Sequence, residues 1–439
     1  MSSLKKIVVL GVCGLLSSSV SYAAEMKSSG IPVTSSLNIT LSAYANFEAA
    51  LRNQNHLTSD EKRLSSNRDF FAFSSKSALI ADISNKMNDV TYGGKIALVP
   101  TAKKSGSPSY NGSHIYVESD FGKVEMGSPM SPSCSMMVDG SEVAAGSGTW
   151  DDYAKFATKH LMGDSKIEPS FASFTEFFLD SKLTTKSSKR AYSSEPARTI
   201  VYYTPKINLS DSSKLRVGIS YTPDSSNTGA DSSSTHSSGV TTKEVGLPDV
   251  YSFEIDSTVK DAVSGGVTVE QNITDGVDIK LALTGEYGKS AGQAKLLKEK
   301  DDKNPSILKL SDLRTFNVGG VMNFGNYSCS GSFGSLGKSL TTPEFHKTGR
   351  NTWYYSGSLA YKQGPFAASV SYFKSDQFKN TVDTISIGTN YLLAPGFQPY
   401  AEISSFTLKG RPEYYNGDSP SSKKSTRGTV ALIGAKLKL

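Results

Sequence analysis

Hydrophobic and polar residues alternate along almost the whole chain, and this pattern restricts the fold more than any other feature. In the first stretch, one side carries Leu37, Ile39, Leu41, Ala43, Ala45 and Phe47, and the other carries Asn38, Thr40, Ser42, Tyr44, Asn46 and Glu48. A period of two residues is typical of a β-strand with two different faces. Similar stretches follow at 68–84, 90–100, 113–120, 122–129, 198–204, 213–222, 249–272, 276–287, 314–325, 327–336, 354–363, 365–375, 382–391, 397–408 and 427–439. The sequence therefore predicts an all-β chain of about sixteen strands, with about eighteen as the next count.

The connections between these stretches are alternately short and long. Short turns are expected at 85–89, Asp120-Phe121-Gly122, 205–212, 273–275, Phe324-Gly325-Asn326, Gln363-Gly364-Pro365 and Ala394-Pro395-Gly396. Long polar segments fall at 52–67, 101–112, 130–197, 223–248, 288–313, 337–353 and 409–426, with a shorter one near 376–381. Outer-membrane barrels have short periplasmic turns and long external loops, whereas a soluble sandwich has no reason to keep that order. We therefore expect one transmembrane antiparallel β-barrel in a bacterial cell outer membrane.

Composition agrees with a barrel and excludes other classes of protein. The mean hydropathy of −0.30 fits strands in which every second residue is apolar. After the N-terminal segment, no apolar run approaches the roughly 20 residues that a transmembrane helix needs. The formal net charge of +6 is small for this length, and the chain has no basic run. Nucleic acid is therefore not an expected partner.

The first 23 residues have the pattern of a secretory signal peptide. Two lysines precede an apolar run at 7–16, and the small residues Ser21 and Ala23 occupy the positions that a signal peptidase recognises. We expect cleavage between Ala23 and Ala24, which would leave 24–439 as one mature domain.

The sequence carries no pattern of an enzyme. The five histidines are scattered, and no HExxH, GxSxG or P-loop motif occurs. We expect neither a cofactor nor a bound metal. Cys134 and Cys329 follow the signal segment, and the sequence leaves open whether they pair.

Four stretches resemble, in their order and spacing, segments of the Gram-negative general porins. The residues 117–127 are similar to the strand, Phe-Gly turn and strand that lead into the third loop of that family, and 198–205 to the strand after this loop. The stretch 385–391, followed by Tyr400-Ala401-Glu402, resembles the penultimate hairpin, and 433–439 the closing strand. The chain departs from the family by ending in Leu439 instead of Phe and by its longer third loop, 130–197.

This resemblance implies a homotrimer in a membrane that contains lipopolysaccharide, with the third loop folded into the lumen. It also implies that loop carboxylates oppose basic residues of the barrel wall, where they would form the pore constriction. The loop offers Asp139, Glu142, Asp151 and Asp152, and the strand registers turn Arg52, Lys76, Lys95 and Arg198 inward. Lys436 and Lys438 would face the lumen near the periplasmic mouth. Because segment 130–197 holds nine acidic and seven basic residues, a preference for anions or cations stays open.

Together these features predict a water-filled channel for passive diffusion of small hydrophilic solutes and ions, since a barrel of about sixteen strands is too wide for side chains to fill. The alternative is a surface barrel, plugged by segment 130–197, whose external loops act as an adhesin or receptor. Segment 171–183 is apolar and aromatic enough to form a short helix that packs either inside the barrel or on a partner.

Overall fold

The structure is a computed structural model of the 439-residue chain. It describes residues 37–55, 71–99, 109–149, 151–157, 197–226, 241–247, 250–255, 258–297, 306–341, 351–377, 380–409 and 425–439. The expected signal peptide with its cleavage site at Ala23 and Ala24, and the expected helix at 171–183, lie outside these residues.

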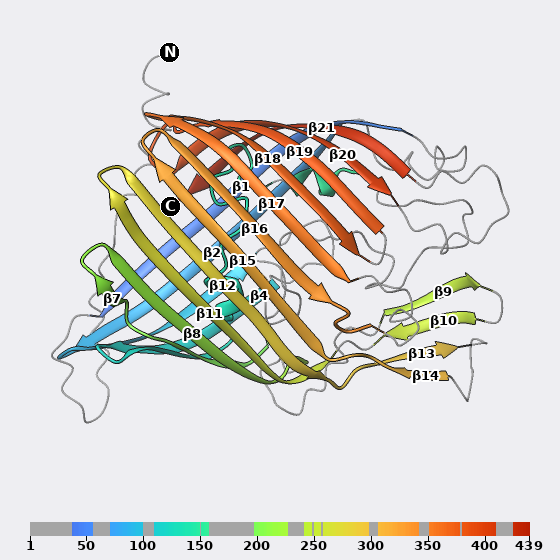
Figure 1. The fold of residues 1–439 in the computed structure, drawn as a ribbon, viewed down its shortest axis with the longest axis horizontal. Helices are drawn as coiled ribbons and strands as arrows, with labels where there is room; N and C mark the ends of the chain where they lie inside the picture. Colours follow the sequence, from blue (N-terminus) through green and yellow to red (C-terminus); the bar gives the residue numbers. More distant parts are fainter. Residues whose placement is uncertain are drawn as a thin grey trace, which may run out of the picture.

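Most strands belong to one closed sheet in which neighbouring strands are antiparallel (Figure 1). It is a 16-stranded barrel with one extra strand, β7 (Ile207–Ser210), which pairs with the same strand as β6. The barrel strands are β1 (Asn38–Gln54), β2 (Phe71–Met87), β3 (Val90–Val99), β4 (Ser109–Ser119), β5 (Gly122–Gly127), β6 (Thr199–Tyr203), β8 (Ser213–Asp224), β11 (Val259–Thr274), β12 (Val277–Ser290), β15 (Leu313–Phe324), β16 (Tyr327–Gly337), β17 (Thr352–Gln363), β18 (Phe366–Gln377), β19 (Asn380–Tyr391), β20 (Phe397–Lys409) and β21 (Ser425–Lys438). The predicted count of sixteen is confirmed, and the count of eighteen is wrong.

The barrel closes where the last strand pairs with the first. The register between β21 and β1 runs from Tyr44 opposite Lys438 to Gln54 opposite Gly428. Ala43 and the C-terminal Leu439 exchange two backbone hydrogen bonds of 2.9 Å. The closure leaves no free edge between the first and last strands, so the backbone groups along this seam are paired.

The two faces of the wall follow the alternation in the sequence. In β1, the side chains of Leu41 and Phe47 face outward and are 64% and 54% exposed, whereas Asn46 and Glu48 face inward and are 6% and 1% exposed. An exposed apolar belt around a polar interior is the arrangement that a lipid environment favours. The buried hydrophobic core therefore lies inside the barrel, where wall residues pack against the segment that follows β5.

Several inward aromatic rings lie across a glycine of the neighbouring strand. A Cβ atom at Gly334 would come within 2.2 Å of the Tyr354 ring, which shows how closely this ring approaches the backbone of β16. The ring covers the backbone that the missing side chain leaves bare, and thereby fixes the register of the two strands. The other pairs of this kind are Gly93 with Tyr116, Gly218 with Tyr203, Gly428 with Phe406, and Gly434 with Tyr400.

The short predicted connections are confirmed at most positions. Strands β17 and β18 are joined through Gly364, whose φ of 56° favours glycine, and β2 and β3 through Asn88, whose φ is 52°. Asparagine tolerates this left-handed conformation better than most residues. The segment 205–212 is an exception, because it contains β7. Pro205 lacks a backbone N–H and separates β6 from β7.

Two predicted long loops contain strands, and one predicted strand is divided. The strands β9 (Thr241–Leu247), β10 (Val250–Ile255), β13 (Gln293–Leu297) and β14 (Ser306–Lys309) form a separate four-stranded sheet. Figure 1 shows this sheet beyond one end of the barrel. The predictions of loops at 223–248 and 288–313 and of one strand at 249–272 are therefore wrong in these parts. Alternation marks a strand but does not tell which partner it pairs with.

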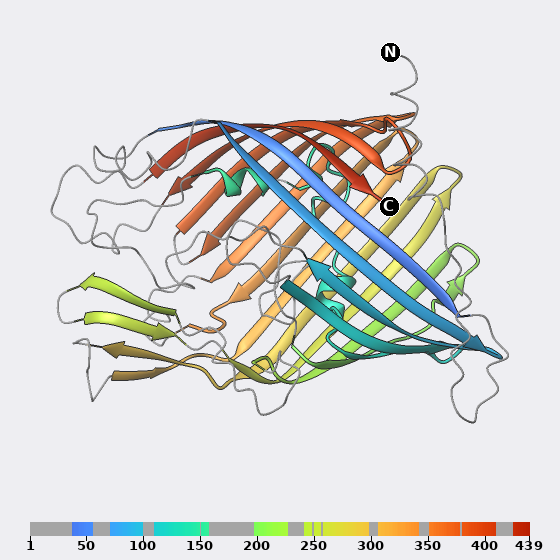
Figure 2. The ribbon, with the colours of Figure 1, turned by 180° about the vertical axis from the view of Figure 1, so that it is seen from behind.

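Two short helical turns, α3 (Pro132–Ser135) and η2 (Asp152–Lys155), follow β5 and lie within the barrel (Figure 2). No helix among the described residues is long and apolar enough to span a membrane.

Candidate functional site

The segment after β5, residues 128–149 and 151–157, lies inside the barrel and follows the inner wall from strand to strand. We call it the inner loop. Met136 lies against β8 and β11, where Cβ atoms at Gly218 and Gly266 would come within 2.6 and 2.9 Å of its sulfur. The carbonyl oxygen of Val138 lies in the same way against Gly319 of β15. Glycines of the wall therefore let the loop approach the backbone of the strands directly.

Serine hydroxyls of the wall bind the backbone of the inner loop. Gly140 donates its N–H to Ser356 Oγ at 3.1 Å and accepts a hydrogen bond from Ser330 Oγ at 2.8 Å. Further along, the N–H of Ala145 donates to Ser369 Oγ at 2.7 Å. The loop forms no strand at these positions, so its backbone N–H and C=O groups have no hydrogen bonds to the backbone of a neighbouring strand. The serine hydroxyls of the wall provide these hydrogen bonds instead.

Two charged wall residues hold the middle of the loop. Glu402 of β20, which is 2% exposed, accepts the N–H of Ser147 at 3.0 Å. Lys436 of β21 donates from Nζ to the carbonyl oxygen of Gly146 at 2.8 Å and lies 5.0 Å from the centre of the Tyr400 ring. The loop thus uses both a carboxylate and an ammonium group that point inward.

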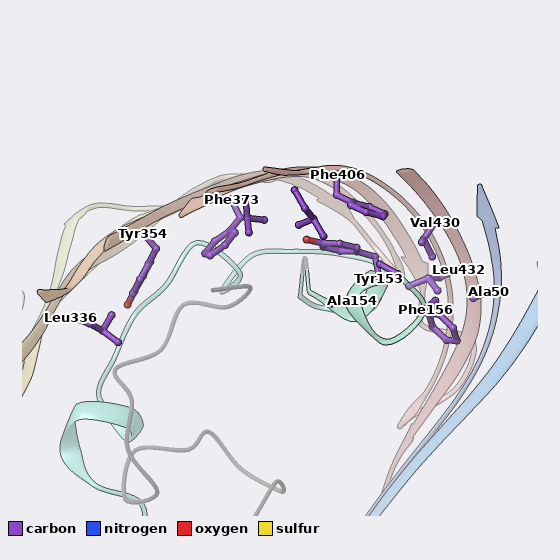
Figure 3. Packing of buried hydrophobic residues seen from close by; sticks show 13 residues of the cluster. Ala50, Tyr153, Ala154, Phe156, Leu336, Tyr354, Phe373, Phe406, Val430 and Leu432 are labelled. Carbon is purple, nitrogen blue, oxygen red and sulfur yellow. The ribbon is translucent and has the colours of Figure 1, made fainter. Parts of the chain in front are cut away.

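The end of the inner loop is anchored by an apolar cluster (Figure 3). Tyr153 is fully buried and stacks on Phe406 of β20, with 4.8 Å between ring centres. Its hydroxyl and that of Thr384 are 2.8 Å apart, and burial raises the pKa of the Tyr153 hydroxyl well above its ordinary value. The ring therefore stays neutral. Ala154, Phe156 and Ala157 join the same cluster, so this part of the loop is packed as firmly as a protein core.

An ion pair lies next to this cluster. Lys155 Nζ is 2.6 Å from Glu48 Oε1 of β1 and 2.7 Å from Asp152 Oδ1. Burial alone would lower the pKa of Lys155, but Asp152 and Glu48 outweigh burial and raise it. Arg52 Nη1, also on β1, donates to the carbonyl oxygen of Phe156 at 3.3 Å. The loop is therefore tied to the first strand of the barrel as well as to the last ones.

A cavity of about 320 Å³ lies between the start of the inner loop and the wall strands β2–β6 and β8. Three cations, Lys95, Lys123 and Arg216, line it together with the carboxylates of Asp82 and Glu125. Lys123 Nζ lies 2.8 Å from Glu125 Oε1, and Tyr116 donates its hydroxyl to Asp82 Oδ1 at 2.9 Å. His114, Tyr203 and Ser135 also reach the cavity. Charged side chains therefore line a cavity inside the barrel.

A family model described as Gram-negative porin matches residues 9–411. The chain belongs to the Gram-negative porin family. Its relatives include an uncharacterized protein of Rickettsia bellii (strain RML369-C), 42% identical over 99% of this chain and 100% of the relative. An uncharacterized protein of Rickettsia prowazekii (strain Madrid E) is 39% identical over 97% of this chain and 99% of the relative. Among solved structures, the anion-selective porin from Comamonas acidovorans is 14% identical, with a TM-score of 0.50 and coverage of 92% of this chain and 100% of that chain.

The family and the closed barrel agree with each other. The family consists of porins of the bacterial outer membrane, and the exposed apolar belt of this barrel suits that environment. The low identity to the Comamonas structure means that this likeness concerns the fold alone.

The four loop carboxylates expected in the constriction of this porin lie in different surroundings. Asp139 is fully buried and accepts hydrogen bonds from the N–H and hydroxyl of Ser141 at 2.7 and 2.6 Å. Asp151 accepts the hydroxyl of Thr149, and Asp152 belongs to the Lys155 ion pair. Glu142 is exposed. The loop is thus folded inward as the family resemblance implied, but Asp139 is enclosed by protein instead of facing open lumen.

The basic wall residues also divide. Lys76 lies opposite Asn46, Lys95 opposite Asp82, and Arg52 opposite the buried Val430, so the register of all three is inward. Arg198 does not share that register: Thr199 and Val201 of β6 are buried inside, and Ile200 is 55% exposed on the outer face. Because Arg198 lies one residue before Thr199, the alternation places it with Ile200, and the inward prediction for Arg198 is wrong. The inward residues of β6 are therefore Thr199, Val201 and Tyr203, one position away from the set that includes Arg198.

At the end of the chain, Lys436 and Lys438 are separated from the buried Val430 and Leu432 by even numbers of residues, so they lie on the same, inward face of β21. Lys436 is, however, 8% exposed and bound to the inner loop. It positions the loop and is nearly inaccessible to solvent.

Sequence reasoning missed Lys123, Glu125 and Arg216 as lumenal residues. The outward-facing Val124 and Met126 flank Glu125 in β5, so strict alternation would have found the first two. Arg216 lies on the same face of β8 as Gly218 and Ser220. This inward face carries no large apolar residue, so the sequence gives little contrast between the two faces there. Cys134 is buried in the loop, Cys329 lies in β16, and no disulfide joins them. The described residues contain no group of three or more metal-ligating side chains.

Proposed function

We propose that this porin forms a water-filled channel for passive diffusion of small hydrophilic solutes and ions across the outer membrane. One observation supports this function most. The inner loop is bound to the wall along β8, β11, β15–β21 and β1, while the cavity beside β2–β5 stays lined by charged side chains. A loop that follows the wall narrows a lumen without filling it, and charged groups in a narrow section select among ions.

The residues of the constriction follow from these positions. We propose that Glu142, Asp151 and Asp152 supply negative charge from the loop, and that Arg52, Lys76 and Lys95 supply positive charge from the wall. Lys438 would add to the positive potential near the periplasmic mouth. Asp139 and Arg198 are left out of this set because of their burial and outward register. A transverse field between the two sets would orient dipolar solutes and filter ions.

The route to the membrane and the assembly belong to the same proposal. We infer export through a signal peptide cleaved between Ala23 and Ala24, and assembly as a homotrimer surrounded by outer-membrane lipid and lipopolysaccharide. Apolar residues exposed on the outer face of β1 and β2, such as Phe47 and Phe73 with ring centres 5.4 Å apart, could contact either lipid or another copy. The family resemblance supports the second role for part of this surface.

The four-stranded sheet favours one other function. The strands β9, β10, β13 and β14 lie beyond the barrel and pair with one another instead of with the wall. Such a sheet would suit a surface receptor or adhesin, the alternative in which segment 130–197 plugs the lumen; residues 158–196 of that segment lie outside the described residues.

Planar lipid bilayers distinguish the two functions. The refolded mature protein should give stepwise openings in groups of three, and a reversal potential in a salt gradient. Glu142→Gln should shift this potential toward anion preference, and Lys76→Gln toward cation preference, because each removes one fixed charge. A correctly folded barrel that never conducts would refute the channel and favour the surface function.

A further inference from the structure

The cavity between the inner loop and the strands β2–β6 and β8 has a surplus of positive charge. It is lined by three cations, Lys95, Lys123 and Arg216, and by two carboxylates, Asp82 and Glu125. Glu125 is 8% exposed and already lies 2.8 Å from Lys123, while Asp82 accepts the Tyr116 hydroxyl. Within the described residues, neither Lys95 nor Arg216 has a carboxylate at ion-pair distance. These two groups are therefore the ones that a negative solute would meet.

Aromatic rings hold two of the cations in place. The guanidinium carbon of Arg216 lies 4.8 Å from the centre of the Tyr203 ring, and Lys123 Nζ lies 4.5 Å from the centre of the Tyr116 ring. Such contacts restrict the side chains without neutralising their charge. Tyr203 is itself held by Ser135 of the inner loop, with 2.6 Å between the hydroxyl oxygens. Arg216 and Lys123 are thus prepositioned, and less conformational entropy is lost when an anion binds to Arg216.

The size and the lining of the cavity indicate the class of anion. A volume of about 320 Å³ is at the lower end of the range for small-molecule sites and is far larger than one halide ion needs. Ile80, Ala97, Met130 and Met136 supply an apolar part of the lining beside the charged groups. A guanidinium presents paired N–H groups that match the two oxygens of a carboxylate. A short aliphatic carboxylate would satisfy both parts of the cavity.

We propose that this cavity is a binding subsite for small aliphatic carboxylate anions, with Arg216 and Lys95 as the binding cations, so that the passage of such anions saturates. The proposal rests on the channel function above and adds a class of solute to it. The single surplus charge of the lining suits a monoanion, because binding one would leave no net charge in the site.

Binding is tested on the folded, detergent-solubilised mature protein by saturation-transfer NMR. Butyrate is the probe, and butyramide is the neutral molecule of matched size. Butyrate should give a transfer signal that saturates, and butyramide should give little or none. Arg216→Gln and Lys95→Gln should each weaken butyrate binding about tenfold, the loss of one charge-assisted hydrogen bond. Lys280→Gln removes an inward cation of β12 outside this cavity, and should leave binding unchanged.

Conductance separates this proposal from the channel function. In planar bilayers, butyrate should reduce the chloride current to a plateau in wild type, and Arg216→Gln should need about ten times more butyrate for the same reduction. A protein that conducts, but neither binds butyrate nor shows a plateau, would overturn the subsite and leave the channel standing. One that binds butyrate and never conducts would overturn the channel and retain the subsite. Equal signals for butyrate and butyramide, or unchanged binding in folded Arg216→Gln and Lys95→Gln, would also overturn the subsite.

Discussion

Lys155 of the inner loop lies 2.6 Å from Glu48 of β1, although 107 residues separate them in the chain. Glu48 is 1% exposed and also accepts the Tyr400 hydroxyl at 2.9 Å. The ion pair therefore connects the end of the loop to the seam where the barrel closes. Any motion of the loop away from the wall would leave a carboxylate buried without its cation, which is costly inside a protein.

Replacement of Lys155 by Gln should loosen the end of the loop. The change removes the ammonium group from Glu48 and Asp152, and we expect a loss of about 1–3 kcal/mol for this contact. The expected result is larger fluctuation of the open-channel current in planar bilayers. Lys155→Arg keeps the charge and should stay close to wild type, and Glu48→Gln combined with Lys155→Gln should recover part of the loss. Current noise in Lys155→Gln equal to wild type would contradict this role.

The same contact should persist at alkaline pH. Burial opposes the charge of Lys155, but Asp152 and Glu48 raise its pKa above the ordinary value of 10.5. For a cation whose folded pKa is raised, the stabilisation is fully present below the unfolded pKa and is lost as pH rises through the folded pKa. Current noise should therefore stay constant from neutral pH to about pH 10 and increase only above it. An increase in noise that begins below about pH 9, and is absent in Lys155→Gln, would show that the pKa is not raised.

Tyr153 should contribute most of the apolar anchoring. Tyr153→Ala removes a fully buried ring that stacks on Phe406, and the expected cost is about 3–5 kcal/mol. Because the barrel closes without the loop, we expect the barrel to form and the loop to become sensitive to protease. Tyr153→Phe loses only the hydrogen bond to Thr384, about 1 kcal/mol, and should resist cleavage like wild type. If protease cleaves both variants at the same rate as wild type, the ring does not anchor the loop.

The fold could be predicted because alternation is a local property. Leu41 and Asn46 lie on the faces that the sequence assigned to them, and sixteen strands close as predicted. The partner of a strand is not local, which is why the sheet formed by β9, β10, β13 and β14 was missed. The face of Arg198 is hard to predict for a related reason. A shift of one residue in the register of a strand moves every side chain to the opposite face of the sheet.

The site could be predicted only in part. An inward third loop followed from the family resemblance, but nothing in the sequence indicates that Asp139 is enclosed while Glu142 stays exposed. That difference depends on the wall residues that the loop contacts more than 190 positions later, such as Ser356 beside Gly140. The alternation did contain the signal for Lys123, since it shares a face with Glu125 between outward apolar residues.

The glycines beneath the inner loop give the sharpest test of its position. A Cβ atom at Gly319 would lie 2.0 Å from the carbonyl oxygen of Val138, so Gly319→Ala forces the loop away from β15. A shift of the loop into the lumen narrows the channel, and we expect a lower single-channel conductance with a barrel of unchanged heat resistance. At Gly265 of β11, the nearest atom to an added Cβ is 3.9 Å away, so Gly265→Ala is the matched control and should conduct like wild type. Because both variants add the same methyl group to a barrel strand, a general effect on the wall would change both conductances equally. A loss confined to Gly319→Ala would mean that direct contact between loop and wall sets the width of the channel, and equal conductance in all three proteins would refute it.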